Sequence, residues 1–458
     1  MTYSIPKRTL LAVVALTTFL VTFMGSSVNI ALPSISSDIQ VDAVTVNWIS
    51  TAYLLATATC LLPFGRLADI YGRKRILTLG VLVFTLASLA IVFVSSPGAI
   101  VALRVVQGVG SAMIATTGVA IITAVFKEGE RGRALGISIT GTYLGLSLGP
   151  VLGGLLIQNL GWRSIFWVIV PIGIVAIVLI ARKIKGEWAE AEGEKFDLFG
   201  TAIYGLSLVG IIYGFSILPD IAGIILVVSG VLGILAFFRW EGRVSSPILN
   251  INILFKNRMF ILSNTIHLIS YTTTFSIAFL LSLYLQYIKG LGPRDAGLVL
   301  VTMAAVQAGF ATFAGKLSDR FDARVLGTAG LIIATIGLSR LIFLGNDTGL
   351  RMIVIYLIML GFGRSLFITS NTHAIMSSVG KVEYGIASAT LATMRQIGMT
   401  FSMGITMLLF SVYIGRVEIT PQYYPVFMES ARTAFIIFTV ICSVAIPFSL
   451  MRGKNTKI

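Results

Sequence analysis

The chain has 458 residues, of which 56% are hydrophobic and 12% are charged, and its mean hydropathy is +0.94. A water-facing surface needs about twice that charged fraction, so the composition excludes an ordinary soluble protein. The formal charge of +15 is divided among short basic clusters between long apolar runs, which argues against nucleic-acid binding. Two cysteines in apolar runs and two histidines do not form a metal-ligand pattern, so we expect neither a metal ion nor a cofactor.

The apolar runs have the length of membrane-spanning helices, which need about 20 residues each. In chain order they lie near 10–30, 47–64, 76–96, 99–121, 135–157, 164–182, 198–217, 221–239, 260–288, 296–315, 326–345, 352–376, 386–413 and 433–451. The sequence therefore predicts an all-α polytopic membrane protein with 14 transmembrane helices. The first run follows Lys7 and Arg8 as the apolar part of a signal peptide would, but we interpret it as a retained helix.

The loops between these runs differ strongly in positive charge. Most Lys and Arg residues fall in one alternating set of segments, and the opposite set contains only Arg163, Lys289, Arg294, Arg351, Arg416 and Arg432. Positive loops stay on the cytoplasmic side, so both termini are predicted to be cytoplasmic. The protein is accordingly expected to be a multi-pass protein of the cell membrane, in contact with the lipid bilayer.

Two cytoplasmic loops repeat a Gly-x-Leu-x-Asp order followed by basic residues. The first extends from Gly65 to Arg75, and the second extends from Gly315 to Arg324. Such a segment provides a tight helix exit and a carboxylate beside a helix end, with cations that can pair with it. We interpret these loops as a conformational switch, and the residues proposed for it are Gly65, Asp69, Gly72, Arg73, Gly315, Asp319 and Arg320. The alternative, a cytoplasmic loop with a turn and no switching role, would explain the basic residues but not the repeated Gly-x-Leu-x-Asp order.

The fourth and fifth apolar runs contain two further motifs, one built around an arginine and a glutamine and the other built from glycines and a proline. In the fourth run, Arg104 precedes Gln107 and Gly108. The fifth run has the spacing G-x8-G-x3-G-P-x2-G-G, formed by Gly136, Gly145, Gly149, Pro150, Gly153 and Gly154. Small residues at this spacing let a neighbouring helix approach closely, and a proline bends a helix. This stretch is predicted to be a hinge, and the alternative is a close-packed face with no moving role.

Together these motifs resemble the major facilitator superfamily. The loop from Gly65 to Arg75 resembles its signature between helices 2 and 3, and the glycine pattern of helix 5 resembles the antiporter signature of drug exporters. The 14 predicted helices, with Asn29 to Pro33 ending the first, are similar to the drug:proton antiporter branch with fourteen spans.

The resemblance implies two six-helix bundles that work by alternating access, with a two-helix hairpin inserted between them. The expected parts are an N-terminal bundle (1–182), a cytoplasmic linker (183–197), the inserted helices 7 and 8 (198–239), a second linker (240–259) and a C-terminal bundle (260–458). The first linker is acidic and is predicted to be a solvated segment. For coupling to protons, the resemblance and the titratable groups indicate Arg104, Gln107, Asp69 and His373. For His373, the alternative favoured by the sequence is a hydrogen-bonded histidine at the membrane interface, since nothing in the sequence pairs it with a carboxylate.

One departure from the family concerns charge inside the membrane. No Asp or Glu lies in the middle of a predicted helix, and Met24 occupies a position where many fourteen-span exporters have an aspartate. Arginines are embedded instead, and an embedded arginine indicates a functional site by default. The residues predicted to line a substrate cavity are Asn29, Arg364, Asn371 and Arg395. For Arg364, the alternative is a structural bond to a facing helix.

The leading hypothesis is a secondary active transporter, a proton-coupled exporter of small amphipathic compounds of the multidrug-efflux type. A specific uptake carrier or facilitator for an anionic or neutral solute is the alternative, because a fold alone does not fix direction or substrate. An intramembrane enzyme is a remote alternative, since the sequence offers no assembled nucleophile, base or metal set. The expected partners are a small-molecule substrate, protons and lipid, and the protein is expected to act as a monomer.

Overall fold

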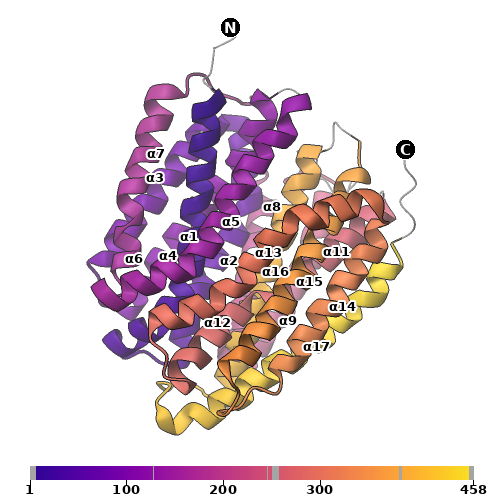
Figure 1. The fold of residues 1–458 in the computed structure, drawn as a ribbon. Helices are drawn as coiled ribbons and strands as arrows, with labels where there is room; N and C mark the ends of the chain where they lie inside the picture. The colour runs from indigo at the N-terminus through magenta and orange to yellow at the C-terminus, as the bar shows by residue number, and fades with distance from the viewer. Residues whose placement is uncertain (1–6, 127, 245, 250–256, 381–383, 453–458) are drawn as a thin grey trace. The chain divides into compact units, whose positions relative to one another are not determined.

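The structure is a computed structural model that describes residues 7–126, 128–244, 246–249, 257–380 and 384–452 (Figure 1). These residues contain 14 helices that are long and apolar enough to cross a membrane, which confirms the predicted fold class. The first nine helices of the chain are α1 (Lys7–Ile39), α2 (Ala43–Tyr71), α3 (Arg73–Val92), α4 (Pro97–Val125), α5 (Glu128–Leu160), α6 (Ser164–Trp167), α7 (Ile169–Lys183), α8 (Leu198–Ile217) and α9 (Ile221–Glu241). The later ones are α11 (Arg258–Thr274), α12 (Ser276–Leu283), the π-helical turn η1 (Tyr284–Ile288), α13 (Pro293–Arg320), α14 (Ala323–Leu341), α15 (Leu350–Ser377), α16 (Tyr384–Tyr413), the 3₁₀ turn η3 (Pro421–Tyr423) and α17 (Tyr424–Leu450).

Two of the spans are made from more than one of these elements. The short α6 and α7 together form one span, residues 164–183. Similarly, α11, α12 and η1 form one span of 31 residues, Arg258–Ile288. Between α8 and α9 the chain turns at Leu218 to Asp220, where the sequence predicts the division between these two helices.

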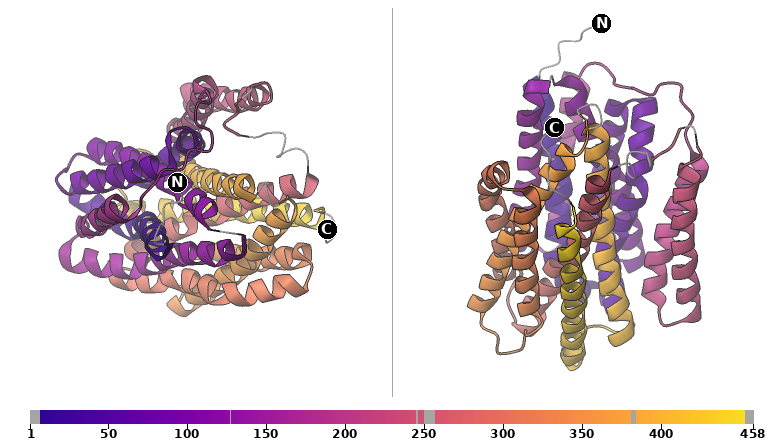
Figure 2. Two further views of the ribbon diagram at one scale, coloured as in Figure 1. Left: turned by 90° about the horizontal axis from the view of Figure 1, so that it is seen from above. Right: turned by 90° about the vertical axis from the view of Figure 1, so that its right-hand side faces the viewer.

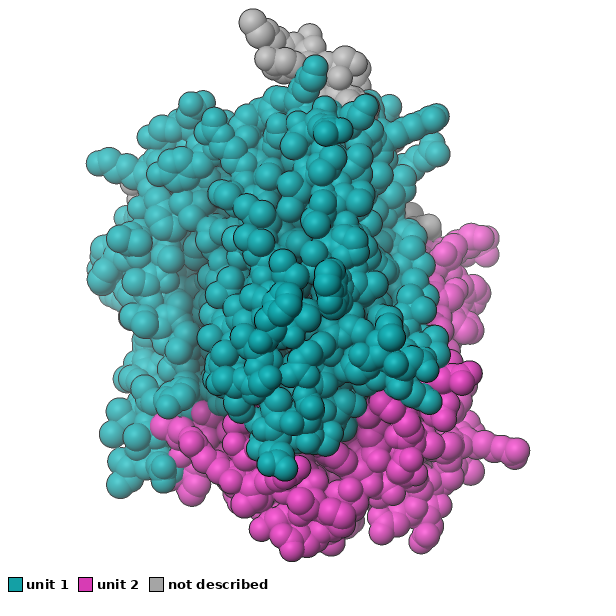
Figure 3. Space-filling model, turned by 90° about the vertical axis from the view of Figure 1, so that its left-hand side faces the viewer, with its two compact units in different colours: residues 1–41, 48–214, 220–249 teal, residues 42–47, 215–219, 250–458 magenta. Residues whose placement is uncertain are grey.

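The chain forms two compact units, coloured separately in Figure 3. Unit 1 comprises residues 1–41, 48–214 and 220–249, and unit 2 comprises residues 42–47, 215–219 and 250–458. In unit 1, α1 packs along α5 and α3 packs along α4, whereas in unit 2, α11 packs along α16 and α14 packs along α15. The two units thus pair their helices in the same order, as expected for an internal repeat.

Most of the α8–α9 hairpin belongs to unit 1, whereas its turn and the end of α8, residues 215–219, belong to unit 2. Figure 2 shows the two helices as an adjacent pair. Gly230 lets them approach closely, because a Cβ atom at that position would lie 2.7 Å from the carbonyl oxygen of Ser207. The hydroxyl of Tyr204 donates a hydrogen bond to the carbonyl oxygen of Ala58 in α2, at 3.0 Å. This bond between helix backbone and a buried tyrosine attaches the hairpin to unit 1.

A stripe of glycines on α5 forms the contact with α1. Gly141, Gly145, Gly149 and Gly153 are four residues apart, and a Cβ atom on any of them would collide with α1. Gly136 differs, since a Cβ atom there would meet nothing within 4 Å. The contact surface therefore includes Gly141, which the helix 5 pattern omits, and excludes Gly136, which the pattern includes.

Hydroxyl groups of α1 add hydrogen bonds across this glycine contact. Ser26 Oγ donates to the carbonyl oxygen of Gly145 at 3.1 Å, and Ser27 Oγ donates to that of Gly149 at 3.0 Å. Pro150 and Gly154 are buried in the same helix. The glycines thus have a packing role inside unit 1, and their role as a hinge stays a prediction.

We expect Gly145→Ala to destabilise the protein by about 1 to 3 kcal/mol, because the added methyl group overpacks the α1 contact. Its control is Gly136→Ala in the same helix, which fills open space and replaces glycine with a better helix former. Thermal unfolding of the purified proteins in detergent should show a lower midpoint for Gly145→Ala only. Equal midpoints in the two variants would contradict the packing role.

Candidate functional site

The first Gly-x-Leu-x-Asp loop joins α2 to α3 through a single residue, Gly72. Its φ of 113° lies in the region that favours glycine, and its conformation places Asp69 and Arg73 on either side of the turn. Arg73 Nε donates to Asp69 Oδ1 at 2.9 Å. The carboxylate and the basic residue that the motif predicts are therefore paired.

Arg73 has a second acidic partner in the linker between α7 and α8. Its Nη1 and Nη2 atoms donate to Glu190 Oε1 and Oε2, each at 2.7 Å, in a bidentate pair. Arg73 Nη1 also donates to the carbonyl oxygen of Ala120, at 3.2 Å. Arg73 is itself 6% exposed, so its charge is balanced within the protein by two carboxylates.

The linker residues 187–194, which we call the 187–194 segment, bind the motif loop through their backbone as well. Ala191 N donates to Asp69 O at 2.9 Å, and Arg73 N donates to Trp188 O at 2.9 Å. Glu187 Oε1 accepts from the backbone nitrogen of Lys74 at 2.7 Å. The sequence suggests a solvated linker, but the structure shows a segment that is partly exposed and attached to the loop, because its glutamates meet the basic residues of the motif.

The second copy of the motif, in unit 2, ends differently. Asp322 stands where Gly72 stands in the first copy, and its Oδ1 accepts from the backbone nitrogen of Arg324 at 2.8 Å as an N-cap of α14. Arg320 is exposed at the end of α13, Gly315 lies within the same helix, and the side chain of Asp319 is outside the described part. The ion-paired arrangement is thus shown for the first copy.

Arg104 of α4 is fully buried in unit 1. Its Nε donates to the carbonyl oxygen of Ile49 at 2.9 Å, its Nη1 donates to Gln107 Oε1, and its guanidinium lies over the ring of Tyr53 at 4.3 Å. Gln107 Nε2 donates in turn to Ser88 Oγ at 2.7 Å. The predicted pair Arg104 and Gln107 therefore forms one buried network that connects α2, α3 and α4.

Arg364 of α15 is buried in unit 2, with 7% of its surface exposed. Its guanidinium lies over the ring of Tyr271 at 4.9 Å, and its Nε lies 3.5 Å from Gln307 Oε1. A distance of 3.5 Å is at the upper limit for a hydrogen bond, so the Gln307 contact is weak. Arg364 is thus a buried cation that contacts an aromatic ring face and a neutral amide in unit 2.

The glycine contacts of the two units show which positions correspond. A Cβ atom on Gly110 of α4 would lie 2.8 Å from Gly80 O of α3, and one on Gly363 of α15 would lie 2.7 Å from Gly330 O of α14. Gly110 and Gly363 are therefore equivalent in the repeat.

This correspondence shows that Arg104 and Arg364 do not occupy equivalent positions in the two units. The residue after Gly363 is Arg364, and the residue after Gly110 is Ser111. By the same count, Leu357 is the counterpart of Arg104. Arg364 is thus a substitution specific to unit 2, at a position where unit 1 has a hydroxyl that bonds the hydroxyl of Tyr53 at 2.9 Å.

The other predicted cavity residues have different surroundings. Asn29 of α1 is buried, and its Oδ1 accepts from Ser50 Oγ at 3.2 Å in unit 1. Arg395 of α16 is half-buried in unit 2. Asn371 of α15 is fully buried, and its Oδ1 accepts from Arg452 Nη1 at 2.5 Å. Burial lowers the pKa of this arginine to about 10, so it remains positively charged at neutral pH.

The two histidines have opposite environments. His373, which the sequence indicates for coupling, is exposed on α15. His267 of α11 is 1% exposed and packs against Tyr271, with ring centroids 5.0 Å apart. Sequence reasoning did not select His267, although an ionisable residue inside a predicted span was the available signal.

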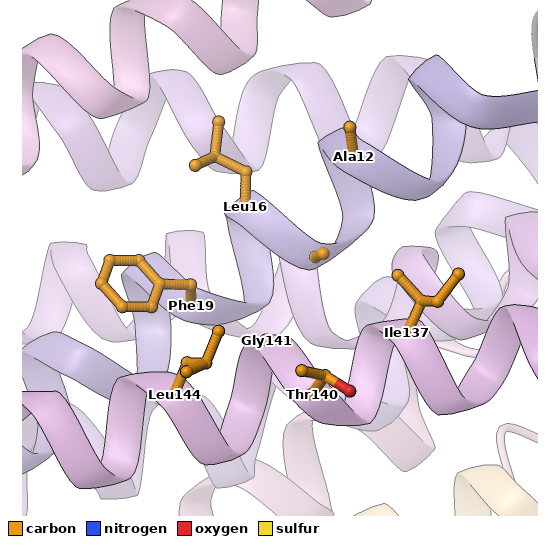
Figure 4. Close-up of a pocket in the computed structure, with 8 residues that line it drawn as sticks. Ala12, Leu16, Phe19, Ile137, Thr140, Gly141 and Leu144 are labelled. Carbon is orange, nitrogen blue, oxygen red and sulfur yellow. The ribbon is translucent and has the colours of Figure 1, made fainter.

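A groove of 360 Å³ opens between α1 and α5 in unit 1 (Figure 4). Apolar side chains line most of it, among them Leu16, Phe19 and Leu144. Its one hydroxyl, that of Thr140, donates to the carbonyl oxygen of Gly136 at 2.9 Å. None of the candidate site residues is among those that line this groove.

The fold and the buried arginines define a class of protein, the multi-pass α-helical membrane protein. The sequence profile of the Major Facilitator Superfamily matches residues 14–403 and, separately, residues 263–457. The chain therefore belongs to the Major Facilitator Superfamily. It is a transporter in the cell membrane and not an enzyme.

Known proteins resemble this chain along most of its length. The riboflavin transporter RibZ of Clostridioides difficile is 29% identical over 398 residues, covering 87% of this chain and 86% of that protein. The cephamycin export protein CmcT of Amycolatopsis lactamdurans is 33% identical over 402 residues, covering 84% and 82%. Among solved structures, an inward-facing, unoccupied bacterial homologue of the human lysosomal transporter Spinster has a TM-score of 0.70 at 17% identity, covering 98% of this chain and 97% of that one, and shows the fold.

We expect Glu190→Gln to loosen the 187–194 segment, because it removes the bidentate carboxylate from Arg73. A cysteine at Ala191, which is 8% exposed, should then react with a maleimide about three- to fivefold faster, as loss of up to about 1 kcal/mol implies for a partly exposed pair. Glu192→Gln is the control, since the described part of the chain contains no ion pair of that neighbouring residue. The same labelling rate in both variants would show that the Glu190 pair does not attach the segment.

Proposed function

We propose that this protein is a proton-coupled exporter of small amphipathic compounds that works by alternating access. The relation to an export protein supports this proposal, and the relation to a riboflavin transporter supports the alternative, a carrier with a defined neutral or anionic solute. Within the proposal, Asp69 and Arg73 act in the conformational switch, Pro150 and the helix 5 glycines act as a hinge, and Arg104 takes part in proton coupling.

The charge preference that we propose for the substrate rests on one observation, the buried positive charge of Arg364. An arginine inside a membrane protein faces either protein acceptors or a water-filled cavity, because its burial in hydrocarbon costs at least about 3 kcal/mol. Arg364 is 7% exposed and lies over the ring of Tyr271, and the sequence has no carboxylate in the middle of a span to neutralise it. We therefore infer that it repels cations and favours anionic or acceptor-rich neutral substrates.

Transport by purified protein in liposomes tests both parts of this proposal. The probes are ethidium as a cation, riboflavin as a neutral molecule with carbonyl acceptors, and benzylpenicillin as a carboxylate. Under proton antiport, a lumen more acidic than the outside should drive accumulation of riboflavin or benzylpenicillin above the level in protein-free liposomes. Accumulation driven only by the opposite gradient would establish the uptake alternative.

Arg364→Met removes the charge and keeps much of the side-chain volume. We expect the melting temperature to stay close to that of the wild type, while benzylpenicillin transport falls at least about tenfold because the anion loses a charged partner. The measurement is initial transport rate together with thermal unfolding. If the variant unfolds, the structural role of Arg364 is the correct one, and if it transports the anion unchanged, the cavity role is wrong.

A further inference from the structure

His267 has one imidazole nitrogen with a partner and one without. Its Nδ1 lies 3.4 Å from Nδ2 of Asn371, while its Nε2 is buried and has no hydrogen-bond partner in the described part of the chain. Ser263 Oγ and Asn264 Oδ1, on the same helix, are buried without a partner among the described residues as well. Buried polar atoms are nearly always bonded in proteins, so this group indicates a place that another molecule occupies.

The hydrogen-bond network fixes which nitrogen of His267 bears the proton. Asn371 Oδ1 accepts from Arg452, and this orients the amide so that Nδ2 faces Ser263 O, at 3.2 Å, and the imidazole. Because an amide nitrogen only donates, His267 Nδ1 must accept. A neutral imidazole that accepts at Nδ1 carries its hydrogen on Nε2. The unpartnered atom is therefore an N–H donor without an acceptor.

The charges around His267 favour this neutral form. Arg452 binds the same Asn371 amide that contacts the imidazole, and Arg364 lies over the ring of Tyr271, which packs against the imidazole. A second proton on the ring would add a like charge near these two cations. His267 is thus suited to donate a hydrogen bond from Nε2.

Tyr271 connects this donor to Arg364. The imidazole centroid lies 5.0 Å from the centroid of the Tyr271 ring, and the guanidinium carbon of Arg364 lies 4.9 Å from the same centroid. Two donors, one of them charged, therefore contact one aromatic side chain inside unit 2. An acceptor group, either a carboxylate or a pair of carbonyl oxygens, is the chemical complement of such a pair.

We propose that His267 Nε2 and Arg364 together bind the carboxylate or carbonyl end of the substrate. This inference rests on the proposed role of Arg364 as a substrate-binding residue and adds a second donor to that site. His267 acts by hydrogen bonding and not by carrying the coupling proton. The substrate class is accordingly that of organic acids and carbonyl-rich neutral molecules.

Two substitutions separate hydrogen bonding from proton carriage. Glutamine can place an amide N–H near the position of Nε2, whereas the shorter asparagine reaches only the position of Nδ1, and neither residue titrates. Binding is measured with purified protein in detergent by quenching of riboflavin fluorescence, and benzylpenicillin is measured by competition. We expect His267→Asn to raise the Kd of riboflavin about tenfold, as loss of one buried hydrogen bond implies, and His267→Gln to stay within about threefold of the wild type.

Either of two outcomes would overturn the proposal. Equal loss of binding in the two variants, with unchanged melting temperatures, would mean that a titrating imidazole is required. Unchanged binding in both would mean that His267 does not touch the substrate. The assay uses no membrane and no pH gradient, so intact binding without gradient-driven transport would disprove the proposed coupling and leave this inference standing.

A second measurement leaves His267 in place and does not depend on the folding of its variants. The chain has two histidines, so wild-type protein with ¹⁵N-labelled imidazoles gives two sets of signals, and His373→Gln identifies which set belongs to His267. We expect the Nε2–H form between about pH 6 and pH 8, and a change in the Nε2 shift when benzylpenicillin is added. The proposal would be refuted if the His267 signal titrated in this pH range, or if its Nε2 chemical shift did not change when benzylpenicillin is added.

Discussion

The hydrocarbon of a bilayer offers no hydrogen bonds, so every polar group placed in it needs a partner inside the protein or in enclosed water. Arg104 shows how this requirement is met, because a backbone carbonyl, an amide oxygen and a tyrosine ring surround its guanidinium. Arg364 is buried over the ring of Tyr271, and His267 has one imidazole nitrogen without a partner among the described residues. Arg104 is therefore part of a structural network, whereas Arg364 and His267 are the candidates for substrate binding.

The same constraint explains how the helices of unit 1 hold together. Apolar side chains gain little by leaving lipid for protein, so close backbone contact has to stabilise the helix pairs. The glycine stripe of α5 permits that contact, and the hydroxyls of Ser26 and Ser27 bond backbone carbonyls across it. A Cβ atom at Gly145 would lie 2.8 Å from the backbone nitrogen of Phe23, whereas one at Gly136, nine residues earlier in the same helix, would meet nothing within 4 Å, so the close contact is confined to one part of α5.

The parts of this structure that the sequence predicts are those set by local pattern. Hydropathy and the turn at Leu218 to Asp220 determine the spans, and the Gly-x-Leu-x-Asp order determines the loop with Asp69 and Arg73. The pairing of Arg73 with Glu190 was not predictable, because those residues are 117 positions apart and their contact depends on where the linker lies. For the same reason, the choice between the two histidines required the structure. Both lie in predicted spans among other polar residues, and only packing shows that His267 is buried and His373 exposed.

The two halves share a fold and differ in their polar residues, and that difference bears on function. In unit 1, Glu190 of the linker binds Arg73 of the motif loop, so the acidic linker is built into the region where switching is proposed. In unit 2, Asp322 caps α14 instead, and an arginine replaces the hydroxyl that Ser111 supplies in the equivalent position of unit 1. A repeat supplies the same helix geometry twice, so substitutions in one copy can create a binding site while the other copy keeps its ion-paired loop. The proposed division of labour follows from this asymmetry: unit 1 holds the ion-paired switch, and unit 2 holds the donors that select the substrate.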